Sequence, residues 1–106
     1  MRALLLMFCL IASSAWAVPD YCANEEIARE DLKQSLLKRY TNNFSAIKLL
    51  LDTGMESYEK LCSAPDSEPS QGIIKTLSSR YYPNFSAIWM LYKSNYSAYK
   101  TLGSEK

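Results

Sequence analysis

The sequence predicts an all-α protein, built as two duplicated antiparallel helical hairpins that pack as a small four-helix bundle with one disulfide. Three observations support this prediction. Apolar residues recur at helical spacing along four segments. The pentapeptide Asn-Phe-Ser-Ala-Ile occurs twice, beginning at Asn43 and at Asn84, which indicates an internal repeat. Two cysteines, Cys22 and Cys62, fall near the first and the last residue of the first predicted hairpin.

The first 17 residues, "MRALLLMFCLIASSAWA", have the pattern of a secretory signal peptide. Arg2 supplies a positive charge, an apolar run follows, and the small residues Ala15 and Ala17 stand where signal peptidase cleaves. The apolar run is about ten residues long, which is well short of the ~20 that a transmembrane helix needs, and no later segment is long enough. We therefore expect residues 1–17 to be cleaved and residues 18–106 to form one exported domain, periplasmic or extracellular.

A disulfide between Cys22 and Cys62 is the expected staple of this domain. Removing 17 residues from 106 leaves 89, a size at which the core alone supplies only a few kcal/mol. An exported chain meets an oxidising compartment, where two cysteines normally pair. Closing a loop of about forty residues is worth roughly 4 kcal/mol in the chain-entropy model. Two free buried thiols are the less favoured alternative.

An offset of 41 residues aligns residues 39–60 with 80–101 and gives nine identities. Five of these form the shared pentapeptide. We interpret the match as a duplication, with units at about 21–62 and 68–102.

The first helix of each unit is predicted at about 21–40 and about 68–82. Each carries a narrow apolar stripe, through Leu32, Leu36, Leu37 and Tyr40 in the first unit and Ile73, Ile74, Leu77 and Tyr81 in the second. Pro83 forces the residue before it out of the helical region and so ends the later of these helices. A loop rich in Pro, Ser and acids, "SAPDSEPSQG", separates the two units.

The second helix of each unit begins at the pentapeptide. Asn43 and Asn84 are the predicted N-caps, because an asparagine side-chain oxygen can accept a hydrogen bond from the backbone N–H two or three residues later. The Phe and Ile of each pentapeptide are expected in the core, together with apolar residues further along. The predicted apolar faces contain Phe44, Ile47, Leu50, Leu51, Met55, Tyr58, Leu61 and Cys62 in the first copy, and Phe85, Ile88, Trp89, Leu91, Tyr92, Tyr96, Tyr99 and Leu102 in the second.

In an antiparallel hairpin the start of the first helix lies beside the end of the second. A Cys22–Cys62 bond would therefore tie the open end of the first hairpin. The duplicated positions are Ser63 and Gly103, so the second hairpin has no equivalent staple and is expected to fray first.

Catalytic chemistry has little support in this sequence. There is no histidine, which removes the commonest general base and imidazole metal sites, and no Cys-x-x-Cys pair or phosphate-binding glycine loop. The acidic stretch "NEEIARED" at residues 24–31 has its charges at ordinary helix-surface spacing, which favours a solvated face over a metal or acid–base site. We predict no enzyme activity, no cofactor and no metal.

Charge divides unevenly along the chain. Residues 20–68 hold ten acids and six bases, whereas residues 69–106 hold one acid and five bases, so the halves carry about −4 and +4. Two solvated surfaces are the simplest interpretation, but the halves could also attract each other or pair two molecules head to tail. Neither half is basic enough for nucleic-acid binding.

Three asparagines, Asn43, Asn84 and Asn95, fit the N-glycosylation pattern. Glycans there are not favoured, since two of these residues are predicted caps. Asn95 is predicted at the edge of the aromatic face, where a glycan would obstruct packing.

The last helix carries the remaining functional candidates, Trp89, Tyr92, Tyr96 and Tyr99, most of which are expected in the core. Trp89 stands where the first copy has Lys48, and aromatic side chains at such an edge suit an interface. The sequence thus favours a non-catalytic, exported interaction or structural accessory protein, with a protein partner or a second copy bound at this face. The alternative is a carrier or chaperone holding an apolar ligand or client between the hairpins. Membrane-surface binding by the last helix is less favoured, because its outer face carries only Lys93 and Lys100.

Overall fold

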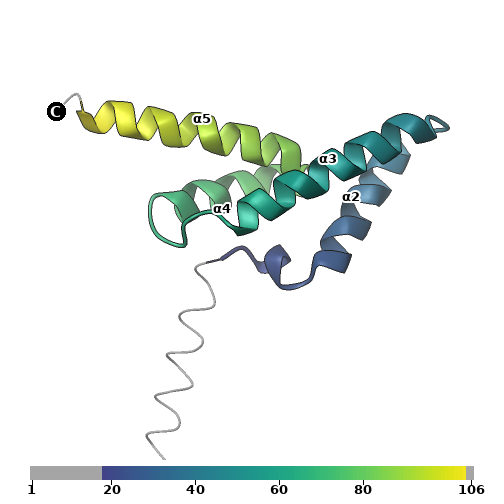
Figure 1. The fold of residues 1–106 in the computed structure, drawn as a ribbon, viewed down its shortest axis with the longest axis horizontal. Coiled ribbons are helices and arrows are strands. Elements are labelled where there is room, and N and C mark those ends of the chain that lie inside the picture. Colours follow the sequence, from purple (N-terminus) through teal and green to yellow (C-terminus); the bar gives the residue numbers. More distant parts are fainter. Residues whose placement is uncertain (1–17, 105–106) are drawn as a thin grey trace, which may run out of the picture.

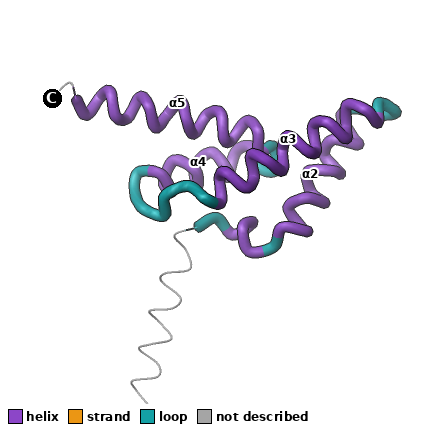
Figure 2. Tube along the Cα trace, in the orientation of Figure 1, coloured by secondary structure: helices purple, strands orange, loops and turns teal. Residues whose placement is uncertain are grey.

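The computed structural model describes residues 18–104, and this part of the chain is helical without any strand (Figures 1 and 2). The elements are the 3₁₀ helix η1 (Asp20–Ala23) and the helices α2 (Glu25–Arg39), α3 (Phe44–Cys62), α4 (Ser70–Tyr81) and α5 (Phe85–Ser104). The predicted all-helical class with four helices is confirmed. The expected signal peptide, residues 1–17, lies outside the described residues. Within them, no helix combines the length and apolar character needed to cross a bilayer.

Asparagine side chains cap three of the helices, as predicted at two of the sites. Each cap oxygen accepts a hydrogen bond from the backbone N–H three residues later, with N to O distances of 3.2–3.3 Å. The pairs are Asn24 with Ile27, Asn43 with Ala46, and Asn84 with Ala87. Tyr82, before Pro83, has φ −54° and ψ 136°, which ends α4 as expected.

The first predicted helix is divided in two, and this differs from the prediction of one helix over about 21–40. Asn24 adopts an extended conformation with φ −144° and ψ 94°, because it serves as the N-cap of α2. The residues before it form η1 instead. This break allows η1 to turn away from α2 and to lie against the end of α3.

Packing follows the predicted pairs, since α2 lies against α3 and α4 against α5, and α3 also packs on α5 (Figure 1). This arrangement is compatible with two duplicated hairpins. The buried apolar core contains residues from all four helices: Ala28, Leu32, Leu36, Ile47, Leu51, Met55, Tyr58, Leu61, Ile74, Phe85, Ile88 and Tyr92.

The two copies are unequally buried. Phe85 is fully buried, whereas the equivalent Phe44 is 65% exposed, so the prediction that Phe44 enters the core is wrong. Phe44 begins α3 at the outer tip of the first hairpin, beside the end of α2 but away from α4 and α5 (Figure 1). Leu102 was also expected on the packed face, yet it is 65% exposed while its equivalent Leu61 is fully buried. The second half of α3 packs on the first half of α5, and the core residues Ile47 and Leu51 lie in the first half of α3, which pairs with α2, whereas the end of α5 is left exposed.

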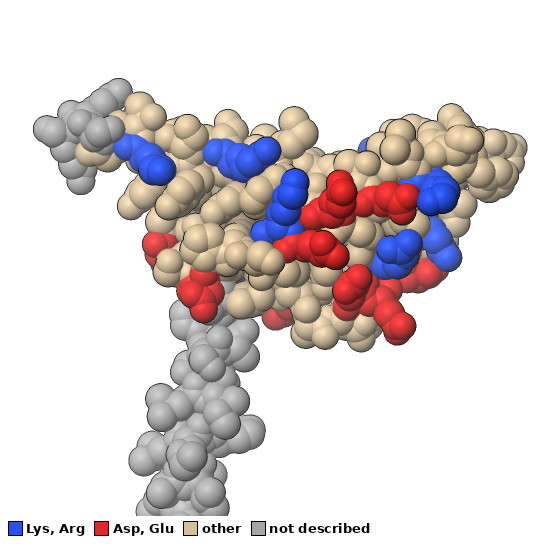
Figure 3. Space-filling model, in the orientation of Figure 1, with Lys and Arg blue, Asp and Glu red and all other residues tan. Residues whose placement is uncertain are grey.

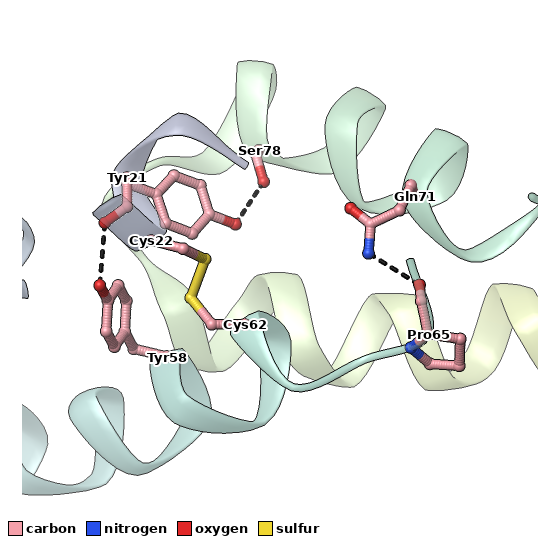
Figure 4. Close-up of a disulfide and its surroundings, with 7 residues drawn as sticks. All are labelled: Tyr21, Cys22, Tyr58, Cys62, Pro65, Gln71 and Ser78. Carbon is pink, nitrogen blue, oxygen red and sulfur yellow. Dashed lines mark hydrogen bonds between the residues drawn. A yellow bond between two sulfur atoms is a disulfide. The ribbon is translucent and has the colours of Figure 1, made fainter. Parts of the chain in front are cut away.

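The predicted disulfide is confirmed. Cys22 of η1 is bonded to Cys62 at the end of α3, with the two Cα atoms 5.7 Å apart and 40 positions apart in sequence (Figure 4). The bond holds η1 against the end of α3, and so closes the open end of the first hairpin.

Candidate protein-interaction surface

An aromatic cluster anchors the segment that follows residue 17. The Tyr21 ring lies 5.4 Å from Tyr82 and 5.3 Å from Phe85 between ring centroids. The Tyr58 hydroxyl donates to the Tyr21 carbonyl oxygen at 2.9 Å, and the Tyr21 hydroxyl shares a 2.7 Å hydrogen bond with Ser78 Oγ (Figure 4). These contacts hold η1 against both α3 and α4, so the cluster has a structural role.

The hydroxyl groups of this cluster stay protonated at neutral pH. Burial raises the pKa of Tyr21 and of Tyr58 above the ordinary value for tyrosine. Burial also raises the pKa of Tyr82, and the adjacent carboxylate of Asp31, which accepts a hydrogen bond from the Tyr82 hydroxyl, raises it further. Neutral hydroxyls of this kind act as hydrogen-bond donors and not as nucleophiles.

The four aromatic residues predicted as an interface form one row along α5. Neighbouring rings are stacked at centroid distances of 5.5, 5.8 and 6.3 Å, in the order Trp89, Tyr92, Tyr96 and Tyr99. Lysine side chains lie over two of the rings, Lys93 at 5.5 Å from Trp89 and Lys100 at 5.6 Å from Tyr96. The structure therefore brings together all four residues, spaced three or four positions apart.

Exposure increases along this row toward the C-terminus. Tyr92 is a core residue, and its hydroxyl shares a 2.9 Å hydrogen bond with Ser70 Oγ at the start of α4. Trp89 and Tyr96 are half-buried, while Tyr99 is 53% exposed. Beyond Tyr92, α5 continues past the start of α4 for residues 93–104, about 18 Å of helix at 1.5 Å per residue. We call residues 93–104 the distal segment of α5.

A second feature, which the sequence did not predict, lies along α2. Two adjoining hollows share Tyr82, whose hydroxyl donates to Asp31 Oδ2 at 2.5 Å. The smaller hollow, about 370 Å³, is mainly apolar and is lined by Asp20, Tyr21, Asn24, Ile27, Ala28 and Tyr82. The larger, about 560 Å³, is lined by Asp31, Gln34, Ser35, Lys38, Arg39, Tyr82 and Pro83. One signal could have indicated the smaller hollow, namely Ile27, an apolar residue outside the predicted stripe of its helix.

Residues 24–31 form a charged helix surface. Glu30 makes a 3.4 Å ion pair with Lys33 and accepts a 2.8 Å hydrogen bond from Gln34. The hydrogen bond from Gln34 lowers the pKa of Glu30 the most, and the hydrogen bond and charge of Lys33 lower it further. In the described part of the chain no cluster of His, Cys, Asp or Glu side chains has the arrangement of a metal site.

Acidic and basic side chains are distributed unequally over the surface. Figure 3 shows Asp and Glu gathered over α2 and α3, where they alternate with Lys and Arg, whereas α5 displays only basic side chains. The sequences of α4 and α5 contain no acidic residue. The difference predicted between the two halves of the chain is therefore a difference between surfaces.

The three glycosylation-pattern asparagines are all exposed. In Asn43 and Asn84 the cap uses the side-chain oxygen. Asn95 donates its side-chain amide to the Leu91 carbonyl oxygen at 2.8 Å, within its own helix. Packing of the described residues therefore leaves Asn95 open, contrary to the expectation that a glycan there would obstruct it.

Comparison with known proteins identifies no relative. The chain matches no family model, and no curated protein or solved structure matches it significantly. Function is therefore inferred from the surfaces described above.

Proposed function

We propose that the protein is an exported, non-catalytic binding protein that docks a protein partner through the distal segment of α5. One observation carries the proposal: three turns of ordered helix extend past α4 and expose Tyr99 and Leu102, at 53% and 65%. The equivalent residues of the first copy, Tyr58 and Leu61, are buried, with exposed fractions of only 4% and 0%. The same apolar positions are thus covered in one copy and open in the other.

The aromatic row is suited to binding because its side chains are already ordered. Each ring stacks on its neighbour, and Lys93 and Lys100 lie over two of the rings. Ordering a flexible side chain on binding costs about 0.5–1.5 kcal/mol, so a preformed row of tyrosines reduces that cost. Tyrosine also brings a large apolar area together with a polar tip.

A carrier that holds an apolar ligand between the hairpins has less support. Such a carrier needs interior tyrosine hydroxyls that face a ligand. The interior hydroxyls instead bond to protein atoms: Tyr21 to Ser78, Tyr58 to the Tyr21 carbonyl, and Tyr92 to Ser70. The disulfide agrees with an oxidising compartment, as proposed for an exported chain.

Photocrosslinking in the compartment where the protein resides tests this function. A photoreactive amino acid replaces Tyr99, and in a matched control it replaces Ser97, an exposed residue on another face of the same segment. We expect a discrete adduct from position 99 and not from position 97. Failure of position 99 to give an adduct, or equal adducts from both positions, would contradict a specific docking face.

A further inference from the structure

We propose that a second copy of this chain occupies the distal segment of α5, and that the segment docks in the apolar hollow between η1, α2 and Tyr82. The copies then associate head to tail. This inference rests on the proposed function and identifies its partner. We call the 370 Å³ hollow and its surrounding acidic side chains the acidic groove.

The acidic groove has an apolar floor and a negative rim. Tyr21, Ala28 and Tyr82 line it, together with Ile27, which is 57% exposed although it is a large apolar residue. Asp20 lies at its edge, and Glu26 and Glu30 are exposed one position before and three positions after Ile27 on α2. Residues 20–31 hold five acids and one base, which gives −4. The groove therefore suits an apolar side chain that is flanked by cations.

The distal segment of α5 has that chemistry. Tyr99 and Leu102 are its exposed apolar side chains, and Lys93 and Lys100 are its charged ones. The whole of α5 carries two bases and no acid, or +2. Opposite charges at the two surfaces would attract the copies and fix their orientation, whereas like charges facing each other disfavour a contact.

Charge also distinguishes this pairing from a symmetric one. If two copies paired α5 against α5, two helices that each carry two lysines and no acidic residue would face each other, and like charges disfavour such a contact. Pairing α5 with the acidic groove avoids that repulsion. A copy cannot fill its own groove with its own helix, because the distal segment of α5 and the helix α2 lie at opposite sides of the molecule (Figure 1).

The contact between the distal segment and the groove is small. A stable interface buries about 800 Å² on each partner, and one face of a three-turn helix supplies less than that. The association should therefore be weak and should weaken further with added salt, which screens exposed charges. Because the contact joins two different surfaces, each dimer retains one free groove and one free α5, so larger rings or chains follow at high concentration.

Complementation between two variants of the full chain tests the orientation. Ile27→Lys places a cation on the groove floor, and the double variant Tyr99→Ser with Leu102→Ser removes the apolar side chains of α5. All three residues are more than half exposed, so the fold should tolerate the changes, and circular dichroism checks that it does. Met90→Ser is the matched control, since Met90 is an exposed apolar residue of α5 outside the distal segment.

Sedimentation velocity gives the readout over a hundredfold range of concentration. For the natural chain and for Met90→Ser, we expect the average mass to rise with concentration and to fall with added salt. Each binding variant alone should remain monomeric. An equimolar mixture of the two should form a one-to-one dimer and nothing larger, because one variant keeps an intact groove and the other keeps an intact α5.

Three outcomes would overturn the head-to-tail inference. The natural chain could remain monomeric, the Ile27→Lys variant could associate as the natural chain does, or the mixture could fail to dimerise. Any of these, combined with a specific adduct from position 99 to a different protein, would leave the proposed binding function standing. Loss of that adduct as well would contradict both the proposed binding function and the head-to-tail inference.

Discussion

The repeated pentapeptide provides a matched pair of mutations that tests the core. Phe85→Ala and Phe44→Ala change the same residue in the same local sequence, at the start of equivalent helices. Phe85 is fully buried, with ring centroids 5.2–5.6 Å from Tyr21, Tyr58 and Tyr82. Phe44 is 65% exposed. The structure therefore predicts very different losses of stability.

The expected losses follow from burial. Removing a fully buried Phe side chain costs about 3–5 kcal/mol, and the three aromatic neighbours of Phe85 favour the upper part of that range. An exposed substitution usually changes stability by about 0.5 kcal/mol or less, which is the expectation for Phe44→Ala. A domain of this size has a total stability of about 4–13 kcal/mol, so Phe85→Ala removes a large share of it.

Urea unfolding followed by far-ultraviolet circular dichroism measures both losses. Phe85→Leu is included because Phe85→Ala could unfold the chain outright, and its smaller change should cost about 1–2 kcal/mol. In thermal unfolding, each kcal/mol should lower Tm by about 4–8 °C for a domain of this length. If Phe44→Ala cost as much as Phe85→Ala, the aromatic cluster around η1 would not be the core that the structure shows.

Three further predictions concern the staple, a close helix contact and alkaline pH. Replacing Cys22 and Cys62 together with Ser should lower the free energy of unfolding by about 2–4 kcal/mol, measured by urea unfolding, because the bond closes a loop of 40 residues. Gly54→Ala should destabilise by about 1–3 kcal/mol, since its Cβ would lie 2.5 Å from Leu32 Cδ2, whereas Gly103→Ala, with nothing within 4 Å, should be neutral or slightly stabilising. The raised pKa values of Tyr21, Tyr58 and Tyr82 mean that the folded state holds these protons more tightly than the unfolded state. Their contribution to stability is therefore complete below a pH of about 10 and declines as pH rises above it, and tyrosinate absorbance should show these three residues ionising above the ordinary range for tyrosine unless the chain unfolds first.

Local signals made most of the fold predictable. Helices α3 and α5 begin at asparagine caps, α4 ends just before Pro83 and α3 ends at the inter-unit loop, and each of these signals is visible in a few consecutive residues. The disulfide was predictable because only two cysteines follow residue 17 and they fall at adjacent ends of one hairpin. The break at Asn24 was missed because a helix that starts at residue 21 fits the same apolar spacing.

Burial along each helix could not be predicted, because it depends on how the hairpins cross. Helical periodicity identifies an apolar face but gives no information on which half of that face is covered. Phe44 and Phe85 share the preceding Asn and the three following residues, Ser-Ala-Ile, yet only Phe85 lies where α3 crosses α5. The acidic groove was missed for a related reason, since Asp31 and Tyr82 are 51 positions apart and meet only after folding.

The exposed end of α5 has a physical explanation in the differences between the two copies. At the end of α3, the disulfide holds η1 in place, and η1 with Phe85 covers Tyr58. At the end of α5, Gly103 replaces the cysteine, so the corresponding Tyr99 and Leu102 have no such cover. A contact from another molecule would cover the end of α5 in the way that η1, held by the disulfide, covers the end of α3. Binding at the distal segment of α5 therefore adds most to the apolar burial of this fold. The lysines of the segment favour a partner surface that is acidic.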